Sequence, residues 1–238
     1  MQNLNKKFIS FSTKVYQCNK CKRLVNFRDN IVSKKRKSYM DQIYWGKPVS
    51  GFGDLNGKIV VVGLAPAAHG ATRTGRVFTG DKSADFLFNC LFKSGLCNQS
   101  NSEHLKDGLK LINTFITLAL RCVPPKDKPT KEELKNCSIF FKEELDIIKN
   151  KKVIVALGKI AFDTCIKFYK ENYGLRGSFK FGHGAKYHIN GLTIFGCYHP
   201  SPRNVNTGRI NETKMIYLFK SKKTNLIGMQ HTPNLQDH

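Results

Sequence analysis

Residues 58–63 read KIVVVG, a short apolar run in which three valines follow an isoleucine. A run of this length, rich in β-branched side chains, predicts a strand that is buried on both faces, as in a parallel sheet. Three runs of the same kind follow along the chain, at residues 114–120, 153–157 and 192–197. Together the four runs predict one sheet of four parallel strands.

Helical patterns separate these runs. Residues 81–95 carry apolar side chains at helical spacing, and Thr130-x-x-Glu133 is a capping box that opens another helix. Two further helices are predicted at residues 158–169 and 209–220. The alternation of strands and helices predicts an α/β fold, a three-layer α/β/α sandwich with a central four-stranded parallel sheet. We expect residues 1–238 to form a single domain.

Basic residues far outnumber acidic ones. The chain has 40 Lys and Arg against 17 Asp and Glu, a formal net charge of +23 at pH 7. Such an excess favours a polyanionic partner, and nucleic acid is a better candidate than an anionic membrane. A solvated, Lys-rich surface with no such partner is the alternative. The basic segment at residues 1–47, which includes KKRK at 34–37, is predicted to be irregular.

The sequence also bears on the cellular compartment. No stretch approaches the roughly 18 consecutive apolar residues of a transmembrane helix, and MQNLNKKFIS lacks the apolar core of a signal peptide. We therefore expect a cytoplasmic protein, associated with the nucleoid through DNA binding, and no membrane partner. The chain has 8 cysteines. Because disulfides are rare in a reducing compartment, some of these cysteines become candidate ligands of a metal or cluster.

Two loops that follow predicted strands carry residue types suited to chemistry. In sheets of this kind the active site lies beyond the carboxyl ends of the strands. Residues 63–81, GLAPAAHGATRTGRVFTGD, are rich in small side chains that let a ligand approach the backbone N–H groups. The loop closes with an aromatic ring, which can stack on a base, and a carboxylate, which can stabilise positive charge on a sugar. Residues 199–209, HPSPRNVNTGR, place a histidine at a strand tip before a stiff polar turn.

These two segments resemble the signature motifs of the uracil-DNA glycosylase superfamily, and most closely those of its type 5, iron–sulfur-containing branch. The resemblance runs from Cys18 to about Arg209. It implies a DNA-repair glycosylase that hydrolyses the N-glycosidic bond of uracil in DNA and leaves an abasic site, with hypoxanthine and xanthine as further candidate substrates. The implied partner is DNA that contains deaminated bases, and we expect a monomer. Because no lysine but Lys82 lies close to the motifs, we expect a monofunctional enzyme.

A glycosylase must stabilise positive charge on the sugar and negative charge on the departing base. Asp81 is the candidate for the sugar side, where it would also orient the attacking water, and the resemblance implies the same position. A purely structural role is the alternative, because Asp81 also precedes a predicted helix as its N-cap. His199 is the candidate for the base side, as a neutral imidazole that donates to uracil O2. A histidine buried in the core is the alternative there.

Other residues of the two motifs are candidates for binding the base and the DNA. Phe78 is expected to stack on the flipped base, and the backbone around Gly63, Ala65 and Ala67 to hold the base edge. Residues 203–207 are expected to form a wedge that enters the duplex. The candidate DNA contacts are Arg73, Arg76, Arg203, Asn204, Asn206 and Arg209. The alternatives are core packing for Phe78, a solvated loop for residues 203–207, and ordinary surface charge for Arg73, Arg76 and Arg209.

Four cysteines form a candidate ligand set. On residue types alone, a Cys-x-x-Cys pair with two distant cysteines could bind zinc or an iron–sulfur cluster. The resemblance implies a 4Fe–4S cluster, with zinc as the alternative, on Cys18, Cys21, Cys122 and Cys137. The cluster would tie the basic segment 1–50 to the domain. The other four cysteines are expected to be buried small apolar residues, at positions Cys90, Cys97, Cys165 and Cys197.

One position departs from the family pattern. Type 5 enzymes commonly carry an asparagine in the second strand, and counted from Cys122 that position is Leu118 in this sequence. Because an amide can read a base edge and a leucine cannot, we expect Leu118 to lie at the base site and to relax the base preference. The departure also leaves open an alternative function, a weak or inactive nucleic-acid-binding homologue that keeps the fold and the cluster.

Overall fold

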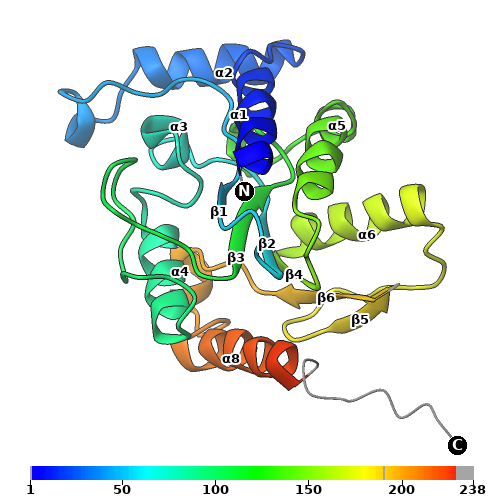
Figure 1. Cartoon of the computed structure of the whole chain (residues 1–238). Coiled ribbons are helices and arrows are strands. Elements are labelled where there is room, and N and C mark those ends of the chain that lie inside the picture. Colours follow the sequence, from blue (N-terminus) through cyan, green and yellow to red (C-terminus); the bar gives the residue numbers. More distant parts are fainter. Residues whose placement is uncertain (1, 190, 229–238) are drawn as a thin grey trace, which may run out of the picture.

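A computed structural model describes residues 2–189 and 191–228. Its central sheet has six strands in the order β1-β3-β2-β4-β6-β5 (Figure 1). The bounds are β1 Phe52–Gly53, β2 Ile59–Gly63, β3 Thr114–Leu118, β4 Val153–Leu157, β5 Lys186–Ile189 and β6 Leu192–Cys197. The four strands predicted from apolar runs are β2, β3, β4 and β6, and they are parallel neighbours. The prediction of a parallel α/β sheet is confirmed.

Two short antiparallel strands extend the sheet at its edges, and the sequence did not predict them. β1 pairs with β3, and β5 pairs with β6. β1 contains two residues, and most of β5 is exposed or only partly buried. Neither forms the continuous apolar run that marks a strand buried on both faces. The predicted count of four strands therefore holds for the centre of the sheet and omits both edges.

Alternate residues of β2 face two layers of helices. Ile59 and Val61 belong to the apolar cluster beneath α4 and α8, whereas Val60 and Val62 belong to the cluster beneath α1, α5 and α6. The helices concerned are α1 Gln2–Tyr16, α4 Lys82–Lys93, α5 Lys131–Ile147, α6 Lys159–Tyr173 and α8 Glu212–Gly228. Because side chains alternate along a strand, one valine run can fill both cores. The predicted three-layer sandwich is confirmed.

The prediction that residues 1–47 are irregular is wrong for residues 2–33. Residues 2–33 form two helices, α1 and α2 (Lys22–Ser33), which lie at the top of the molecule in Figure 1. The side chains of Phe11 and Val15 on α1 are fully buried, and Phe8 contacts Phe115 of β3 with ring centroids 5.6 Å apart. These apolar residues recur at helical spacing, but the lysines between them hide the pattern in a simple reading of charge.

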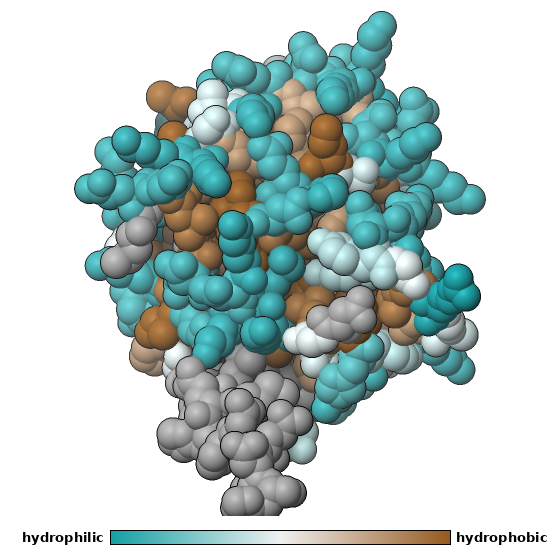
Figure 2. Space-filling model, turned by 45° about the vertical axis from the view of Figure 1, so that its right-hand side comes forward, coloured by the Kyte–Doolittle hydropathy of each residue, from teal (hydrophilic) through white to brown (hydrophobic). Residues whose placement is uncertain are grey.

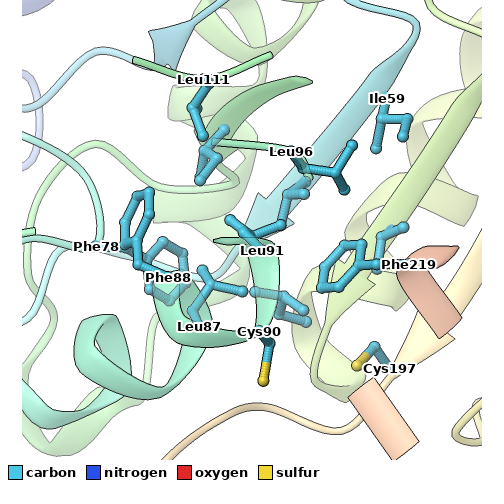
Figure 3. Packing of buried hydrophobic residues seen from close by; sticks show 14 of the residues in the cluster. Ile59, Phe78, Leu87, Phe88, Cys90, Leu91, Leu96, Leu111, Cys197 and Phe219 are labelled. Atoms are coloured by element: carbon cyan, nitrogen blue, oxygen red, sulfur yellow. The ribbon is translucent and has the colours of Figure 1, made fainter. Parts of the chain in front are cut away.

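The four cysteines expected to be small core residues are buried. Cys90 and Cys197 lie among the apolar side chains of the first cluster (Figure 3), and both are 0 % exposed. Burial raises the pKa of the Cys90 thiol to about 12 and that of Cys97 to about 11. These thiols therefore stay protonated and behave as apolar groups, as predicted.

The surface of the molecule is largely hydrophilic, as Figure 2 shows for one face. Within residues 2–189 and 191–228, no helix has both the length and the apolar character needed to span a membrane.

Candidate active site

A pocket of about 1040 Å³, open to solvent, lies beyond the carboxyl ends of β2 and β6. The loop after β2 forms one wall, and the residues after β6, up to the start of α7 (Pro202–Asn206), form another. The side chains that line it and bear on the chemistry are Ala65, Ala67, Phe78, Asp81, Asp127 and His199. The topology thus brings the two motifs, which are more than a hundred residues apart in sequence, into one site.

Asp81 holds the N-terminus of α4 with one carboxylate oxygen. Its Oδ1 accepts hydrogen bonds from the backbone N–H groups of Ser83 (2.9 Å) and Ala84 (3.0 Å). The other oxygen, Oδ2, lies against Gly70, where an added Cβ would overlap it. Burial raises the pKa of the Asp81 carboxyl, and the two amide hydrogen bonds oppose that shift. Capping uses only Oδ1, so the capping role is compatible with the predicted catalytic role.

The Phe78 ring forms a wall of the pocket and faces His199. The two ring centroids are 6.1 Å apart, with an interplanar angle of 33°. Phe78 has a positive φ of 47°, an uncommon conformation for a residue with a large side chain. Its ring rests on the backbone of Gly63, where an added Cβ would lie 2.8 Å from Phe78 Cε2. A strained backbone and a bare glycine together fix an aromatic face at the site.

His199 stands at the end of β6, and its backbone is held in place. The side-chain amide of Asn204 donates to the His199 carbonyl oxygen at 2.9 Å. Burial lowers the pKa of the imidazole to about 4, and the Asp127 carboxylate opposes that shift. His199 is therefore neutral near pH 7, as the predicted role on the base side requires.

Asp127 lines the same pocket, and the sequence analysis did not single it out. It lies in the short helical turn Pro125–Asp127 (η2), where Lys126 and Asp127 both have a φ of 55°. Two adjacent residues with side chains in this region are strained, and such strain clusters at functional sites. The signal available in the sequence was position alone, because residues 121–129 follow the buried strand β3. That position places an exposed carboxylate beside Asp81 and His199.

The predicted base-holding residues fall into two groups. Ala65 and Ala67 line the pocket, and Gly63 supports the Phe78 ring from below. Leu118 does not line the pocket: it is 1 % exposed and packs in the core against Gly63. The expectation that Leu118 contacts the base is wrong. Leu118 pairs with Gly63 across β2 and β3, and its side chain belongs to the apolar cluster beneath α4 and α8.

Arg76 is not available to contact phosphate, and its prediction as a DNA contact is wrong. Its side chain is 4 % exposed and pairs with Asp107 at 2.6 Å. It also donates to Thr79 and Ser102. Although burial acts to raise the pKa of Asp107, the Arg76 guanidinium and backbone N–H groups hold it well below its usual range. The pair is a structural ion pair that braces the loop before α4.

Arg73 is partly exposed, and its guanidinium is engaged within the protein. It donates to the carbonyl oxygens of His69 (2.7 Å) and Gly80 (2.8 Å) and to Gln42 Oε1 (2.6 Å). Its guanidinium carbon lies 4.0 Å from the centre of the Tyr39 ring. Its observed role is to hold the loop that carries Asp81, and the predicted contact with DNA stays a prediction.

The segment predicted as a wedge begins with α7. Arg203, Asn206 and Arg209 are exposed on it or just after it, so all three can be reached by a large partner. Asn204 is partly buried and supports the His199 backbone. Arg209 lies over the Tyr198 ring at 5.0 Å. The segment thus offers two exposed cations next to the pocket.

The four candidate ligand cysteines line one small hollow between α2 and α5. Three of their sulfurs accept N–H groups. Arg28 Nη1 donates to Cys122 Sγ (3.8 Å), Asn136 Nδ2 to Cys21 Sγ (3.7 Å) and the Arg121 backbone N–H to Cys137 Sγ (3.3 Å). Such N–H donors around the sulfurs are typical of the surroundings of an iron–sulfur cluster.

Among the described residues, no group of three or more His, Cys, Asp or Glu side chains is arranged to hold one metal ion. The predicted ligand set, and the choice between a cluster and zinc, therefore stay predictions.

Contacts between helices support the same region. Arg23 of α2 donates to both carboxylate oxygens of Glu133 at 2.7 Å. Glu133 also belongs to the predicted capping box, which is present: its backbone N–H bonds to Thr130, and its carboxylate accepts from the Thr130 N–H. The ends of α2 and α5 are therefore clamped together by side chains alone.

Comparison with known proteins places these features in a family. Residues 50–221 match the model of the uracil DNA glycosylase superfamily. The chain is 43 % identical over 200 residues to a type-5 uracil-DNA glycosylase of Pyrobaculum aerophilum, which covers 84 % of this chain and 85 % of that protein. It is 41 % identical over 209 residues to the type-5 enzyme of Thermus thermophilus, with 87 % and 92 % covered. A type-4 uracil-DNA glycosylase of Sulfurisphaera tokodaii is more distant, with 29 % identity over 79 % of this chain and 71 % of that protein.

Proposed function

This chain belongs to the uracil-DNA glycosylase superfamily, and on that premise we propose that it is a monofunctional uracil-DNA glycosylase that acts in DNA repair. The reaction is hydrolysis of the N-glycosidic bond of uracil in DNA, which leaves an abasic site. The observation that carries the proposal is the meeting of Asp81, Phe78 and His199 in one pocket at the carboxyl edge of the sheet.

The pocket can take a base that has left the duplex. A flipped uracil would lie with its ring against Phe78, whose conformation is fixed by the strained backbone and by Gly63. Ala65 and Ala67 present no bulky side chains, so the base edge can approach their backbone. The enzyme therefore prepares the base site before substrate arrives.

Asp81 acts on the sugar side. As the bond between C1′ and N1 breaks, its electron pair leaves with the base and C1′ gains positive charge. Asp81 Oδ2, the oxygen not used for capping, would stabilise that charge and accept a proton from the water that attacks C1′. The raised pKa of the carboxyl makes it a better proton acceptor than an exposed aspartate.

His199 acts on the base side. A neutral imidazole donates an N–H to uracil O2 and stabilises the negative charge that the base carries away. Because burial holds the pKa of His199 near 4, this group stays neutral and donates without transferring its proton. Asn204 keeps the backbone of His199 in position for that contact.

Hypoxanthine and xanthine are proposed as further substrates. The argument from Leu118 to a relaxed preference no longer applies, because Leu118 is buried in the core. Asp127 supplies a different argument for these substrates. Uracil, hypoxanthine and xanthine each present a ring N–H where cytosine and adenine present a lone pair, and a carboxylate accepts only from the former. Asp127 is an exposed carboxylate in the pocket and suits that N–H.

A 4Fe–4S cluster is the proposed cofactor, held by Cys18, Cys21, Cys122 and Cys137. The hollow between them and the N–H donors to three of the sulfurs support this proposal. When bound, the cluster would link the α2 end of the N-terminal segment to the sheet and α5 covalently, as a structural element. Zinc stays the alternative, and metal analysis of the purified protein distinguishes the two.

The remaining proposals concern the state of the protein in the cell. We propose a monomer that acts in the cytoplasm, in contact with the nucleoid through DNA. The net charge of +23 supports binding to DNA at many sites before a uracil is found.

One experiment tests the activity. Purified protein is incubated with single- and double-stranded oligonucleotides that contain uracil, hypoxanthine or xanthine, and then with alkali. Cleavage that needs alkali supports a monofunctional glycosylase. Cleavage without alkali would contradict the monofunctional mechanism, and binding with no cleavage of any substrate would support the inactive homologue instead.

A further inference from the structure

A second hollow extends the active-site pocket toward the N-terminal part of the chain. This groove has an empty volume of about 1830 Å³ and shares Ala67, Asp81 and Asp127 with the pocket. Its other wall is formed by residues between α2 and β1, which include Arg36, Ser38, Tyr39 and Gln42. The catalytic candidates therefore lie between two segments, α7 on one side and residues 34–43 on the other. We call residues 34–43 the basic arm.

The basic arm exposes two large apolar side chains. Ile43 is 94 % exposed and Met40 is 60 % exposed, although apolar residues of this size are usually covered. Three exposed cations precede them on the arm, namely Lys34, Arg36 and Lys37, and one exposed acid, Asp41, lies between the two apolar residues. Apolar side chains next to exposed cations are the pattern by which proteins enter the minor groove and unstack bases.

The arm is attached to the loop that carries Asp81. Gln42 accepts from Arg73 at 2.6 Å, and the Tyr39 ring lies against the same guanidinium at 4.0 Å. Just beyond the arm, the hydroxyl of Tyr44 bonds to His69 Nδ1 at 3.0 Å. Binding of a partner to the arm can therefore affect the loop that carries Asp81 through these contacts. Such a preordered surface loses little conformational freedom when it binds.

From these observations we propose that the basic arm is a second DNA-contacting element, opposite α7. Met40 and Ile43 insert into the duplex beside the flipped nucleotide, and the cations of the arm contact the neighbouring phosphates. The arm carries three exposed cations against one exposed acid, Asp41, whereas Asp85 and Glu103 line the groove on other segments, so the phosphates follow the arm. The inference rests on the proposed function, because it takes the duplex around a uracil as the ligand.

The insertion is tested with the double variant Met40→Ser/Ile43→Ser. The matched control is Ile139→Ser, which removes an apolar side chain that is 55 % exposed on α5, outside the groove. Loss of a buried apolar contact of about 1.4 kcal/mol corresponds to a tenfold change in affinity. We expect the double variant to bind duplex product containing an abasic site about tenfold more weakly. Cleavage of single-stranded uracil DNA should change by less than about twofold, because there is no duplex to enter.

Two outcomes would overturn the proposal. Unchanged affinity of the double variant for the duplex product means that the arm does not insert. An equal loss on single-stranded and duplex DNA, with an unchanged circular dichroism spectrum, means that the arm supports the site and does not enter the duplex. A wild-type protein that releases no base at all contradicts the proposed function, whereas the arm is judged by affinity for product, which needs no catalysis.

The phosphate contacts are tested by salt dependence. The triple variant Lys34→Ala/Arg36→Ala/Lys37→Ala is compared with Lys6→Ala/Lys7→Ala/Lys135→Ala, which removes the same charge from exposed positions on α1 and α5. Each lost phosphate contact lowers the slope of log affinity against log salt by about 0.9. We expect a fall of roughly two to three for the arm variant and almost none for the control. Equal slopes in both would show that the arm acts only through net charge, and the proposal would be wrong.

Discussion

Gly70 and Asp81 are in such close contact that a side chain at residue 70 and the carboxylate at residue 81 exclude each other. A Cβ on Gly70 would overlap Asp81 Oδ2 and would lie 2.9 Å from its Cγ. The same carboxylate is fixed on its other oxygen by the N-terminus of α4. The missing side chain at Gly70 therefore leaves room for Oδ2, the oxygen to which we assign the reaction.

Substitution Gly70→Ala should reduce activity and leave the fold intact. The added methyl group would turn the carboxylate away from the sugar, and overpacking of this kind costs about 1–3 kcal/mol of stability. We expect kcat to fall by at least tenfold, since misplacement by about 1 Å can cost 10²-fold. Kinetics on a uracil oligonucleotide and thermal unfolding measure the two effects. The control is Gly182→Ala, whose added Cβ meets its nearest neighbour, Ala185 Cβ, at 3.8 Å.

Substitution Asp81→Asn should separate catalysis from stability. Asparagine is as good an N-cap as aspartate, so the hydrogen bonds to Ser83 and Ala84 can persist. We expect the rate to fall on the order of 10²- to 10³-fold, while Tm stays the same or rises because a buried charge is removed. A variant that cleaves uracil at the wild-type rate would show that Asp81 is only a cap.

Activity should fall on the acid side of neutrality. The proposed mechanism needs Asp81 ionised and His199 neutral. The pKa of Asp81 is raised by burial, and that of His199 is lowered to about 4, so acidification protonates both groups in turn. We expect kcat/KM to decline as the pH falls toward the His199 pKa of about 4, and the raised pKa of Asp81 makes the decline begin at a higher pH than an exposed aspartate would. A profile that peaks at acid pH would contradict both roles.

The histidine also gives a stability signal. Its pKa is about 4 in the folded protein, below its ordinary value of about 6.5, so the unfolded chain takes up a proton first. Stability is therefore lost as the pH falls from about 6.5 to about 4, and His199→Asn should abolish that part of the loss. In Asp127→Asn the pKa of His199 should fall further, because the Asp127 carboxylate raises it. Nuclear magnetic resonance titration of the ring measures the shift.

Arg76 should matter for stability and not for DNA affinity. It forms a buried ion pair with Asp107, and removal of one partner leaves a buried charge. We expect Arg76→Ala to lose about 3–5 kcal/mol of stability, with an unchanged salt dependence of DNA binding in the fraction that folds. A reduced slope against salt would show that Arg76 reaches phosphate after all.

The purified protein should be brown and should contain iron and acid-labile sulfide. Cys122→Ser should remove the colour and the iron, whereas Cys90→Ser, in the apolar core beneath α4, should keep both. Thermal unfolding of the two variants compares the structural effects. If the wild-type protein contains zinc and no sulfide, the cluster proposal is wrong and zinc is the bound metal.

The sequence predicted those features that one short segment determines. β2 and its parallel neighbours are continuous apolar runs because both faces are buried, and the capping box at Thr130 and Glu133 is read from four residues. The position of His199 just after β6, and that of Asp81 at the end of the loop that follows β2, were predicted from the same strands. The grouping of residues from both motifs in one pocket then follows from the parallel order of the strands.

Other features depend on partners that are distant in sequence. Arg76 is an ordinary arginine in the motif until Asp107, which lies in a separate loop, pairs with it. Asp127 lines the pocket in a turn where Lys126 and Asp127 both adopt positive φ values, and no residue type in that turn predicts this conformation. α1 was missed because its apolar stripe is interrupted by lysines, and burial against α5 and β3 decides its structure.

The clamp between Arg23 and Glu133 bears on the order in which the molecule is assembled. Small zinc domains fold only when their ion arrives, because nothing else gathers the ligands. Here the ends of α2 and α5 are joined by an ion pair with two 2.7 Å hydrogen bonds, independent of any inorganic group. We therefore expect the chain to fold with its four candidate thiols already gathered, so that delivery of the proposed cluster would be a loading step on a folded protein. Depletion of iron would then leave an intact precursor that is competent for later repair.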